Sequence, residues 1–327
     1  MKTVKDISSV AGRRPIMLAV GFFDGIHRGH KKVIGQAIQS ARQAGGEAWV
    51  FTFDRHPLSI LAPDSAPVLL TSGEHKLSLL ERMGVDGCVV LPFTTEAASL
   101  SPAAFAARLL DCAPPLKRIF AGRNWKFGRN SAGTVYLLKR AAEKVDVQVT
   151  AVVPVRRRKK FISSSRIRCH VGGGNLKEAE IMLGRPYGLM GKVVRGDSRG
   201  FDLGFPTANL DTKGELLPPD GVYAVSALAG RRAAHGVLNV GVRPTFGDEG
   251  RGRTVEVHLI NHGKNLYGKT IEILFAARIR NERAFSSKNL LKSQISRDIG
   301  KAAGILRRKK PHEKFQEWLY TNIPRLI

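Results

Sequence analysis

The chain of 327 residues is 43% hydrophobic, which is enough for two domains that each bury a core of their own. It carries 53 lysines and arginines against 27 acidic residues, and the resulting formal net charge of +26 favours anionic partners. No apolar run approaches the ~20 residues that a membrane-spanning helix needs, and the N-terminus lacks the apolar core of an export signal.

The first predicted element is a buried strand over Pro15–Val20, and a Gly-rich turn at Gly21–His30 separates it from a helix over Lys31–Ile38. Glycine allows the backbone to turn sharply and to approach a ligand closely. The first turn of the helix adds unpaired N–H groups and the positive end of the helix dipole. These features predict a phosphate site.

Two histidines of this turn, His27 and His30, are three residues apart and so share one face of the helix start. Their imidazoles, neutral or protonated, can donate hydrogen bonds to a polyphosphate as pyrophosphate leaves. A zinc pair or a solvated helix start would give the same spacing, although no Cys or third His lies nearby to complete a tetrahedral zinc site. The turn matches neither the dinucleotide-binding pattern nor the Walker pattern.

Two further buried strands are predicted at Trp49–Phe53 and Arg118–Gly122, and the loops Asp54–Pro57 and Arg123–Gly128 follow them. Strands that alternate with helical stretches predict a doubly wound parallel sheet, a Rossmann-like α/β fold. In such folds ligands bind beyond the carboxyl ends of the strands, where these loops lie.

The segment Phe161–Arg168 places three serines and Arg168 at the start of a predicted helix. Hydroxyl groups and a guanidinium at a helix start can clamp phosphates. Serines before a helix are also common as an ordinary N-cap, and the segment alone does not separate the two interpretations.

After Leu183–Tyr187 the pattern changes to short β-branched segments between Gly, Pro and Asn turns. This spacing predicts a small antiparallel β-barrel and a boundary near residue 184, with domains at 1–183 and 184–327. The predicted strands are Gly191–Gly196, Gly221–Ser226, Ala234–Val240, Thr254–Ile260 and Thr270–Phe275. A C-terminal helix is predicted over Leu290–Asp298, where apolar residues recur at helical spacing.

The chemistry of the second half is predicted at Gly200–Leu210, where Thr207 and Asn209 offer a hydroxyl and an amide oxygen. Such oxygens suit a Mg²⁺ ion that carries a nucleotide. Glu256 can face a cleft, because its strand neighbours should point to the opposite face. Phosphoryl transfer needs neutralised charge, aligned reactants and a carboxylate that orients or deprotonates the attacking hydroxyl. An exposed turn and a surface glutamate are the structural alternative.

In this order the motifs resemble those of bacterial bifunctional riboflavin kinase/FAD synthetases. The His-x-Gly-His box of Gly21–His30 and the Ser-Ser-x-x-x-Arg segment are similar to phosphate motifs of the nucleotidylyltransferase superfamily. The sequences Phe-x-x-His-Pro and Gly-x-Asn-Trp-x-Phe-Gly resemble the flavin-adenylating module. The Gly-Phe-Pro-Thr-Ala-Asn run at 204–209 resembles the riboflavin kinase motif, and matching runs follow at 218–223, 239–246 and 266–268.

The resemblance implies that the barrel phosphorylates riboflavin to FMN and that the sheet domain moves AMP from ATP onto FMN, which yields FAD and pyrophosphate. Mg²⁺ would serve both steps. The residues implied to bind ATP in adenylyl transfer are Gly21, Phe22, Asp24, Gly29, Asn124, Ser164, Ser165 and Arg168, with His27 and His30 as catalytic groups. The implied flavin contacts are His56, Pro57, Arg280 and Asp298. In the kinase, Gly204, Thr207 and Asn209 would bind ATP and the metal, and Glu256 would be catalytic.

Some positions depart from the family pattern. Phe22 stands where Asn is frequent, Arg55 where Pro is common, Ser165 for Thr, Phe201 for Arg, and Asn261–His262 for Asp-Phe. None of these changes removes a catalytic group. The loss of a cation at Phe201, near the implied kinase nucleotide, makes kinase efficiency the more doubtful of the two activities.

Two basic runs, Arg156–Lys160 and Arg307–Lys310, support a rival interpretation as a nucleic-acid-associated or membrane-surface protein. Blocks this short are usually solvated, aromatic residues are only 7%, and no nucleic-acid-binding signature is present. We therefore expect small-molecule substrates, no dedicated nucleic acid partner and no membrane. A chain in which only one half is active is the other alternative.

The three cysteines, Cys88, Cys112 and Cys169, are scattered. They predict neither a disulfide framework nor a zinc cluster. A cytoplasmic location is therefore expected.

Overall fold

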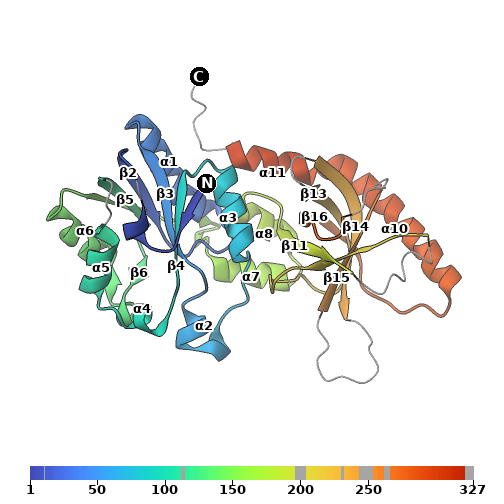
Figure 1. Ribbon diagram of the computed structural model, residues 1–327. Helices are drawn as coiled ribbons and strands as arrows, with labels where there is room; N and C mark the ends of the chain where they lie inside the picture. Colours follow the sequence, from blue (N-terminus) through green and yellow to red (C-terminus); the bar gives the residue numbers. More distant parts are fainter. Residues whose placement is uncertain are drawn as a thin grey trace. The chain divides into compact units, whose positions relative to one another are not determined.

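The protein is described by a computed structural model over residues 1–10, 12–111, 115–195, 204–229, 232–242, 253–260 and 266–320. The chain forms two compact units (Figure 1). The first contains Met1–Leu69 and Gly73–Ser164, and the second contains Ser165–Trp318 together with the short segment Leu70–Ser72. The positions Cys112, Phe201, 243–246 and Asn261–His262 lie outside the described residues.

The first unit is built on a sheet of parallel strands in the order β1-β4-β3-β2-β5-β8, which confirms the predicted doubly wound α/β fold. The strands are β1 (Lys2–Val4), β2 (Ile16–Val20), β3 (Glu47–Phe53), β4 (Gly87–Leu91), β5 (Leu116–Gly122) and β8 (Gln148–Val152). All of β2 is buried, as its unbroken apolar sequence predicts. The three strands predicted from the sequence all end at the predicted residue, so the loops beyond them lie where a ligand is expected.

Helices connect these strands. They are α1 (Arg28–Gln43), α2 (Leu58–Leu61), α3 (Gly73–Arg82), α4 (Thr95–Ser99), α5 (Pro102–Leu110) and α6 (Val135–Glu143). Short 3-10 turns lie at Ile7–Ser9, Pro63–Ser65 and Arg129–Ser131. Two small hairpins pair β6 (Lys126–Phe127) with β7 (Gly133–Thr134), and β9 (Arg156–Arg157) with β10 (Lys160–Phe161).

Packing around Trp49 fixes the register of β3 against β4. Trp49 is buried and lies opposite Gly87 in the ladder. A Cβ atom on Gly87 would come within 2.4 Å of the indole ring, so the close approach of the two strands requires glycine at this position. The indole Nε1 donates to Glu47 Oε2 over 2.9 Å, which leaves no buried donor unsatisfied on this ring.

The second unit contains the predicted antiparallel barrel, closed in the order β11-β12-β15-β14-β13-β16. Its strands are β11 (Gly188–Val194), β12 (Ala208–Asp211), β13 (Gly221–Ala229), β14 (Arg232–Val242), β15 (Arg253–Leu259) and β16 (Thr270–Arg280). β16 pairs with both β13 and β11 and so completes the ring. The barrel has no open edge, which removes a site for strand-to-strand aggregation.

Four helices of the second unit are described. They are α7 (Ser164–Gly172), α8 (Leu176–Leu183), α10 (Lys288–Lys309) and α11 (Pro311–Tyr320). The predicted C-terminal helix is the first half of α10, which packs on β13, β14 and β16. Ala302 and Leu306 of α10 form a small core with Ala224 of β13.

Replacing Leu306 with Ala tests this helix-on-barrel core. Leu306 is 0% exposed, so its truncation should lower the free energy of unfolding by about 2–5 kcal/mol in a denaturant titration. The same change at Leu290, which is 51% exposed on the same helix, should have little effect. Equal losses for the two variants would contradict the packing described here.

Candidate functional site

The turn between β2 and α1 is held in an unusual backbone conformation. Phe23, Gly25 and Ile26 have φ values of 56°, 79° and 37°. Left-handed φ is unusual for a β-branched residue such as Ile26, and it persists only where the surroundings enforce it. Phe23 and Ile26 are both buried, so core packing holds the turn in this shape.

His27 is the N-cap of α1. Its Nδ1 accepts hydrogen bonds from the backbone N–H groups of Gly29 (3.1 Å) and His30 (3.2 Å). An imidazole that accepts at Nδ1 carries its proton on Nε2, which is therefore the donor atom. A Cβ on Gly29 would lie 3.0 Å from His27 Cε1, so glycine leaves room for the ring.

His30 stacks on His27, with ring centroids 3.5 Å apart and an interplanar angle of 20°. The ring of Phe23 also meets the ring of His30 edge-on, with centroids 5.3 Å apart. Burial holds the pKa of His30 well below its usual value, and the charges of His27 and Lys76 lower it further. His30 is therefore neutral at pH 7, and its ring can act as a donor without becoming a cation. Its buried Nδ1 has no hydrogen-bond partner among the described residues.

The structure brings one residue of the predicted serine clamp to this turn. Ser164 Oγ donates to the backbone oxygen of Asp24 over 2.9 Å, although the two are 140 residues apart. Asp24 itself is buried. Ser165 and Arg168 follow on α7, where Ser165 is exposed and Arg168 is half-buried.

The loop implied to border the flavin also reaches the turn. The ring of His56 meets the ring of Phe22 edge-on, with centroids 5.0 Å apart. His56 Nδ1 accepts from Leu58 N over 3.2 Å, and Pro57 caps α2. Asn124 follows the end of β5 and is exposed. Residues implied for the nucleotide and for the flavin thus meet at Phe22 and His56.

Sequence reasoning missed Lys76, which lies on α3 and is only 4% exposed. Its Nζ donates to Phe22 O (3.2 Å) in the turn, and to Phe53 O and Thr52 Oγ1 (3.1 Å each) at the end of β3. A signal was present, because Lys76 precedes Leu79 and Leu80 by three and four residues and so occupies the apolar face of its helix.

In the barrel, Asn209 and Glu256 are direct cross-strand partners between β12 and β15. Glu256 also pairs with Asn239 of β14, so the three side chains form a row on one face of the barrel wall. Val255 and Val257 are buried while Glu256 is half-buried, which confirms the predicted alternation. Asn239 was not singled out from the sequence, because strand pairing and not sequence distance places it in this row.

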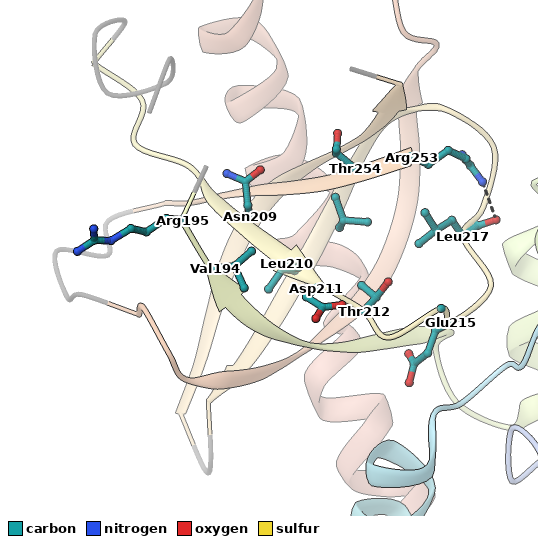
Figure 2. A pocket seen from close by; sticks show the side chains of 12 residues that line it. Val194, Arg195, Asn209, Leu210, Asp211, Thr212, Glu215, Leu217, Arg253 and Thr254 are labelled. Carbon is teal, nitrogen blue, oxygen red and sulfur yellow. Dashed lines mark hydrogen bonds between the residues drawn. The ribbon is translucent and has the colours of Figure 1, made fainter. Parts of the chain in front are cut away.

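Asn209 also lines a cavity of about 530 Å³ (Figure 2). The lining residues are Val194, Arg195, Asn209, Leu210, Asp211, Thr212, Gly214, Glu215, Leu217, Arg253, Thr254 and Val255. Thr207 and Glu256 are not among these lining residues. Gly204 is exposed and precedes β12 in the chain. The structure therefore joins Asn209 to the cavity and to Glu256, while Thr207 lies two residues before Asn209 in the chain.

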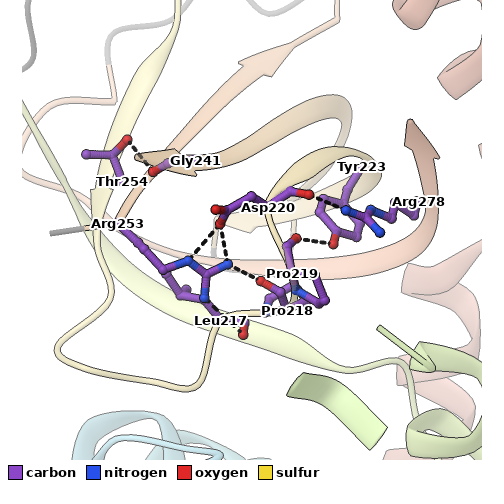
Figure 3. Close-up of polar contacts among 9 residues, drawn as sticks. All are labelled: Leu217, Pro218, Pro219, Asp220, Tyr223, Gly241, Arg253, Thr254 and Arg278. Atoms are coloured by element: carbon purple, nitrogen blue, oxygen red, sulfur yellow. Dashed lines mark hydrogen bonds and ion pairs between the residues drawn. The ribbon is translucent and has the colours of Figure 1, made fainter. Parts of the chain in front are cut away.

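Polar contacts hold the wall of this cavity in place. Arg253 forms an ion pair with Asp220 (2.6 Å) and donates to the backbone oxygens of Leu217 and Pro218 (Figure 3). Glu215 is buried, and its carboxylate accepts from the N–H groups of Ser72 (2.7 Å) and Met190 (2.9 Å). These bonds fix the loop that connects β12 to β13.

Arg280 and Asp298, the implied flavin contacts of the tail, form an ion pair of 2.8 Å. Asp298 is only 1% exposed, and its second oxygen accepts from Gln294 Nε2 over 2.8 Å. Arg283 donates in turn to Gln294 Oε1. The network ties β16 to α10, and a flavin contact by these residues stays a prediction.

Comparison with known proteins gives a consistent result. Residues 10–166 match the FAD synthetase family, and residues 183–306 match the riboflavin kinase family. The bifunctional riboflavin kinase/FMN adenylyltransferase of Escherichia coli (strain K12) is 35% identical over 91% of this chain and 96% of its own. The protein of the same description from Bacillus subtilis (strain 168) is 36% identical over 86% of this chain and 90% of its own.

A crystal structure described as a macrolide-efflux protein from Streptococcus pneumoniae has the same fold, with a TM-score of 0.77 at 32% identity over 91% of this chain and 97% of that one. Among the described helices of this chain, none is long and apolar enough to cross a membrane. The order of the two matched domains and the extent of the related sequences lead to one assignment. The chain belongs to the family of bifunctional riboflavin kinase/FMN adenylyltransferases.

Proposed function

We propose that the first unit transfers AMP from ATP to FMN, and that the barrel transfers the γ-phosphoryl group of ATP to riboflavin. The observation that carries the first assignment is the stacked pair of His27 and His30 at the N-terminus of α1. The second assignment is supported by Asn209, which joins the cavity of the barrel to Glu256. Riboflavin would be converted to FMN in the barrel and FMN to FAD in the sheet domain.

In adenylyl transfer, a phosphate oxygen of FMN attacks the α-phosphorus of ATP and the bond to the bridging β-phosphate oxygen breaks. A phosphate monoester is largely ionised at pH 7, so no base has to remove a proton from the nucleophile. The leaving pyrophosphate gains charge, which Nε2–H of His27 and the neutral ring of His30 can stabilise by hydrogen bonds. Ser164, Ser165 and Arg168 would hold the same phosphates.

In the kinase reaction, the terminal hydroxyl of the riboflavin side chain attacks the γ-phosphorus of ATP and ADP leaves. This nucleophile carries a proton, and Glu256 would orient the hydroxyl and accept that proton. Thr207 and Asn209 provide uncharged oxygen donors, which fit a nucleotide-bound Mg²⁺ ion. When bound, the ion supplies positive charge beside the phosphates.

The domain boundary near residue 184 and the cytoplasmic location stay predictions. So do the use of Mg²⁺ and the small-molecule substrates riboflavin, FMN and ATP without a dedicated nucleic acid partner. The positively charged side chains of Arg156–Lys160 precede Ser164 closely in the chain, and they would raise the local concentration of ATP.

Turnover of riboflavin tests the proposed pair of activities directly. Purified protein with riboflavin and Mg-ATP should form FMN first and FAD later, measured by chromatography. FMN as the sole product would mean that only the barrel is active. FAD formed only from supplied FMN would mean that only the sheet domain is active. No flavin product under any condition would favour a basic nucleic-acid-associated protein on this scaffold.

Replacing Glu256 with Gln should lower the rate of FMN formation by about 10²–10⁴-fold, because the hydroxyl loses its proton acceptor. FAD synthesis from supplied FMN should continue at the rate of the unchanged protein. Glu313→Gln is the matched control, since this glutamate of α11 is half exposed and pairs only with Lys310 among the contacts described. Parallel loss of both activities in Glu256→Gln would argue against separate sites.

Replacing either His27 or His30 with Ala should raise the barrier to FAD formation by about 2–4 kcal/mol and spare riboflavin phosphorylation. Because His27 also caps α1, its removal should cost about 1 kcal/mol of stability as well. His27→Asn separates the two effects, since Asn restores a cap acceptor but not the ring donor. Full FAD output from this variant would exclude His27 from the mechanism.

A further inference from the structure

The turn between β2 and α1 is in contact with a buried cation, Lys76. Lys76 shares the inner face of α3 with Leu79 and Leu80, which are both fully buried. Burial of an ammonium group raises the free energy of the folded state unless hydrogen bonds compensate it. An apolar residue at this position would not carry that desolvation penalty. The presence of lysine therefore calls for an explanation other than packing.

The ammonium group of Lys76 has three donors, and three oxygens receive them. Two belong to the end of β3, namely Thr52 Oγ1 and Phe53 O, and the third is Phe22 O in the turn. Thr52 Oγ1 also donates to Phe22 O over 2.9 Å. Strand end, turn and helix are thus joined through one nitrogen atom.

The ring of Phe22 continues this arrangement. Lys76 Nζ lies 4.5 Å from the centroid of the ring, in the range of a cation–π contact. The same ring meets His56 edge-on. Phe22 is therefore held through both its carbonyl oxygen and its side chain, and it contacts the loop implied to border the flavin.

The charge of Lys76 also acts on His30. It is one of the causes that lower the pKa of His30. Burial lowers the pKa of Lys76 itself to about 8, although Cys88, Asp24 and Asp54 act in the opposite direction. At pH 7 the amine is therefore mainly protonated, and it disfavours a second positive charge on His30.

We propose that Lys76 is a positioning residue for adenylyl transfer, which holds the Phe22 carbonyl against the end of β3 and thereby sets the position of His27 and His30. This inference rests on the proposed FMN adenylyltransferase activity. Lys76 donates to protein oxygens and so acts through the turn, not on the phosphates. A displacement of about 1 Å at a reacting group can reduce a rate by about 100-fold.

Lys76→Met is the first test, because it keeps the length of the side chain and removes its donors. At saturating ATP and FMN, kcat for FAD formation should fall by about 10–100-fold, while the KM for ATP changes by less than about threefold. Riboflavin phosphorylation by the same preparation should be unchanged.

Leu79→Ala is the matched control for stability. It truncates a buried side chain of the same helix without a contact to Phe22 in the bonds described, and thermal unfolding measures the loss of stability in both variants. At an assay temperature where both are folded, Leu79→Ala should keep most of its kcat. A loss of kcat in Leu79→Ala as large as in Lys76→Met would reduce Lys76 to a structural role and overturn the proposal.

Thr52→Val provides the second, independent test, and it decides the matter if Lys76→Met does not fold. Loss of the hydroxyl should lower kcat by about 3–10-fold. In the double variant the two losses should not add, because both act through the Phe22 carbonyl. Additive losses, or a full rate in both single variants, would refute the role of Lys76. A wild-type protein that makes no FAD would instead refute the proposed function.

Discussion

The N-cap of α1 is the contact on which the proposed adenylyl-transfer site depends. His27 uses Nδ1 to satisfy two N–H groups at the helix start, so only Nε2 is left for a ligand. An aspartate would cap the helix equally well but, as an acceptor only, would offer no donor to a ligand. One side chain thus fixes the backbone and presents a proton, and His30 is held in place by stacking on it.

Much of this arrangement could be predicted from the sequence. Apolar runs are local signals, and they located the carboxyl ends of β2, β3 and β5 at the right residues. Contacts that depend on the pairing of distant strands could not be found in this way. The row of Asn209, Glu256 and Asn239 arises from barrel register, and neither spacing nor composition encodes it.

Lys76 was missed for a different reason. A lysine at one position of a helix is usually an exposed residue, and its burial is decided by the carbonyl groups of Phe22 and Phe53, which belong to other elements. The net charge of +26 does not locate Lys76 either, because it counts buried and exposed cations alike.

The two proposed reactions differ in their need for a base, and the residues of the two units differ accordingly. FMN attacks as an ionised phosphate, and the turn of the first unit offers Nε2–H of His27 and the neutral ring of His30 as donors. Riboflavin attacks as an alcohol and needs an acceptor. In the second unit, the buried carboxylates of Asp298 and Glu215 already accept hydrogen bonds from Arg280, Gln294 and backbone N–H groups. Glu256 is half-buried beside Asn209, a position consistent with its proposed role as acceptor for the proton of the riboflavin hydroxyl.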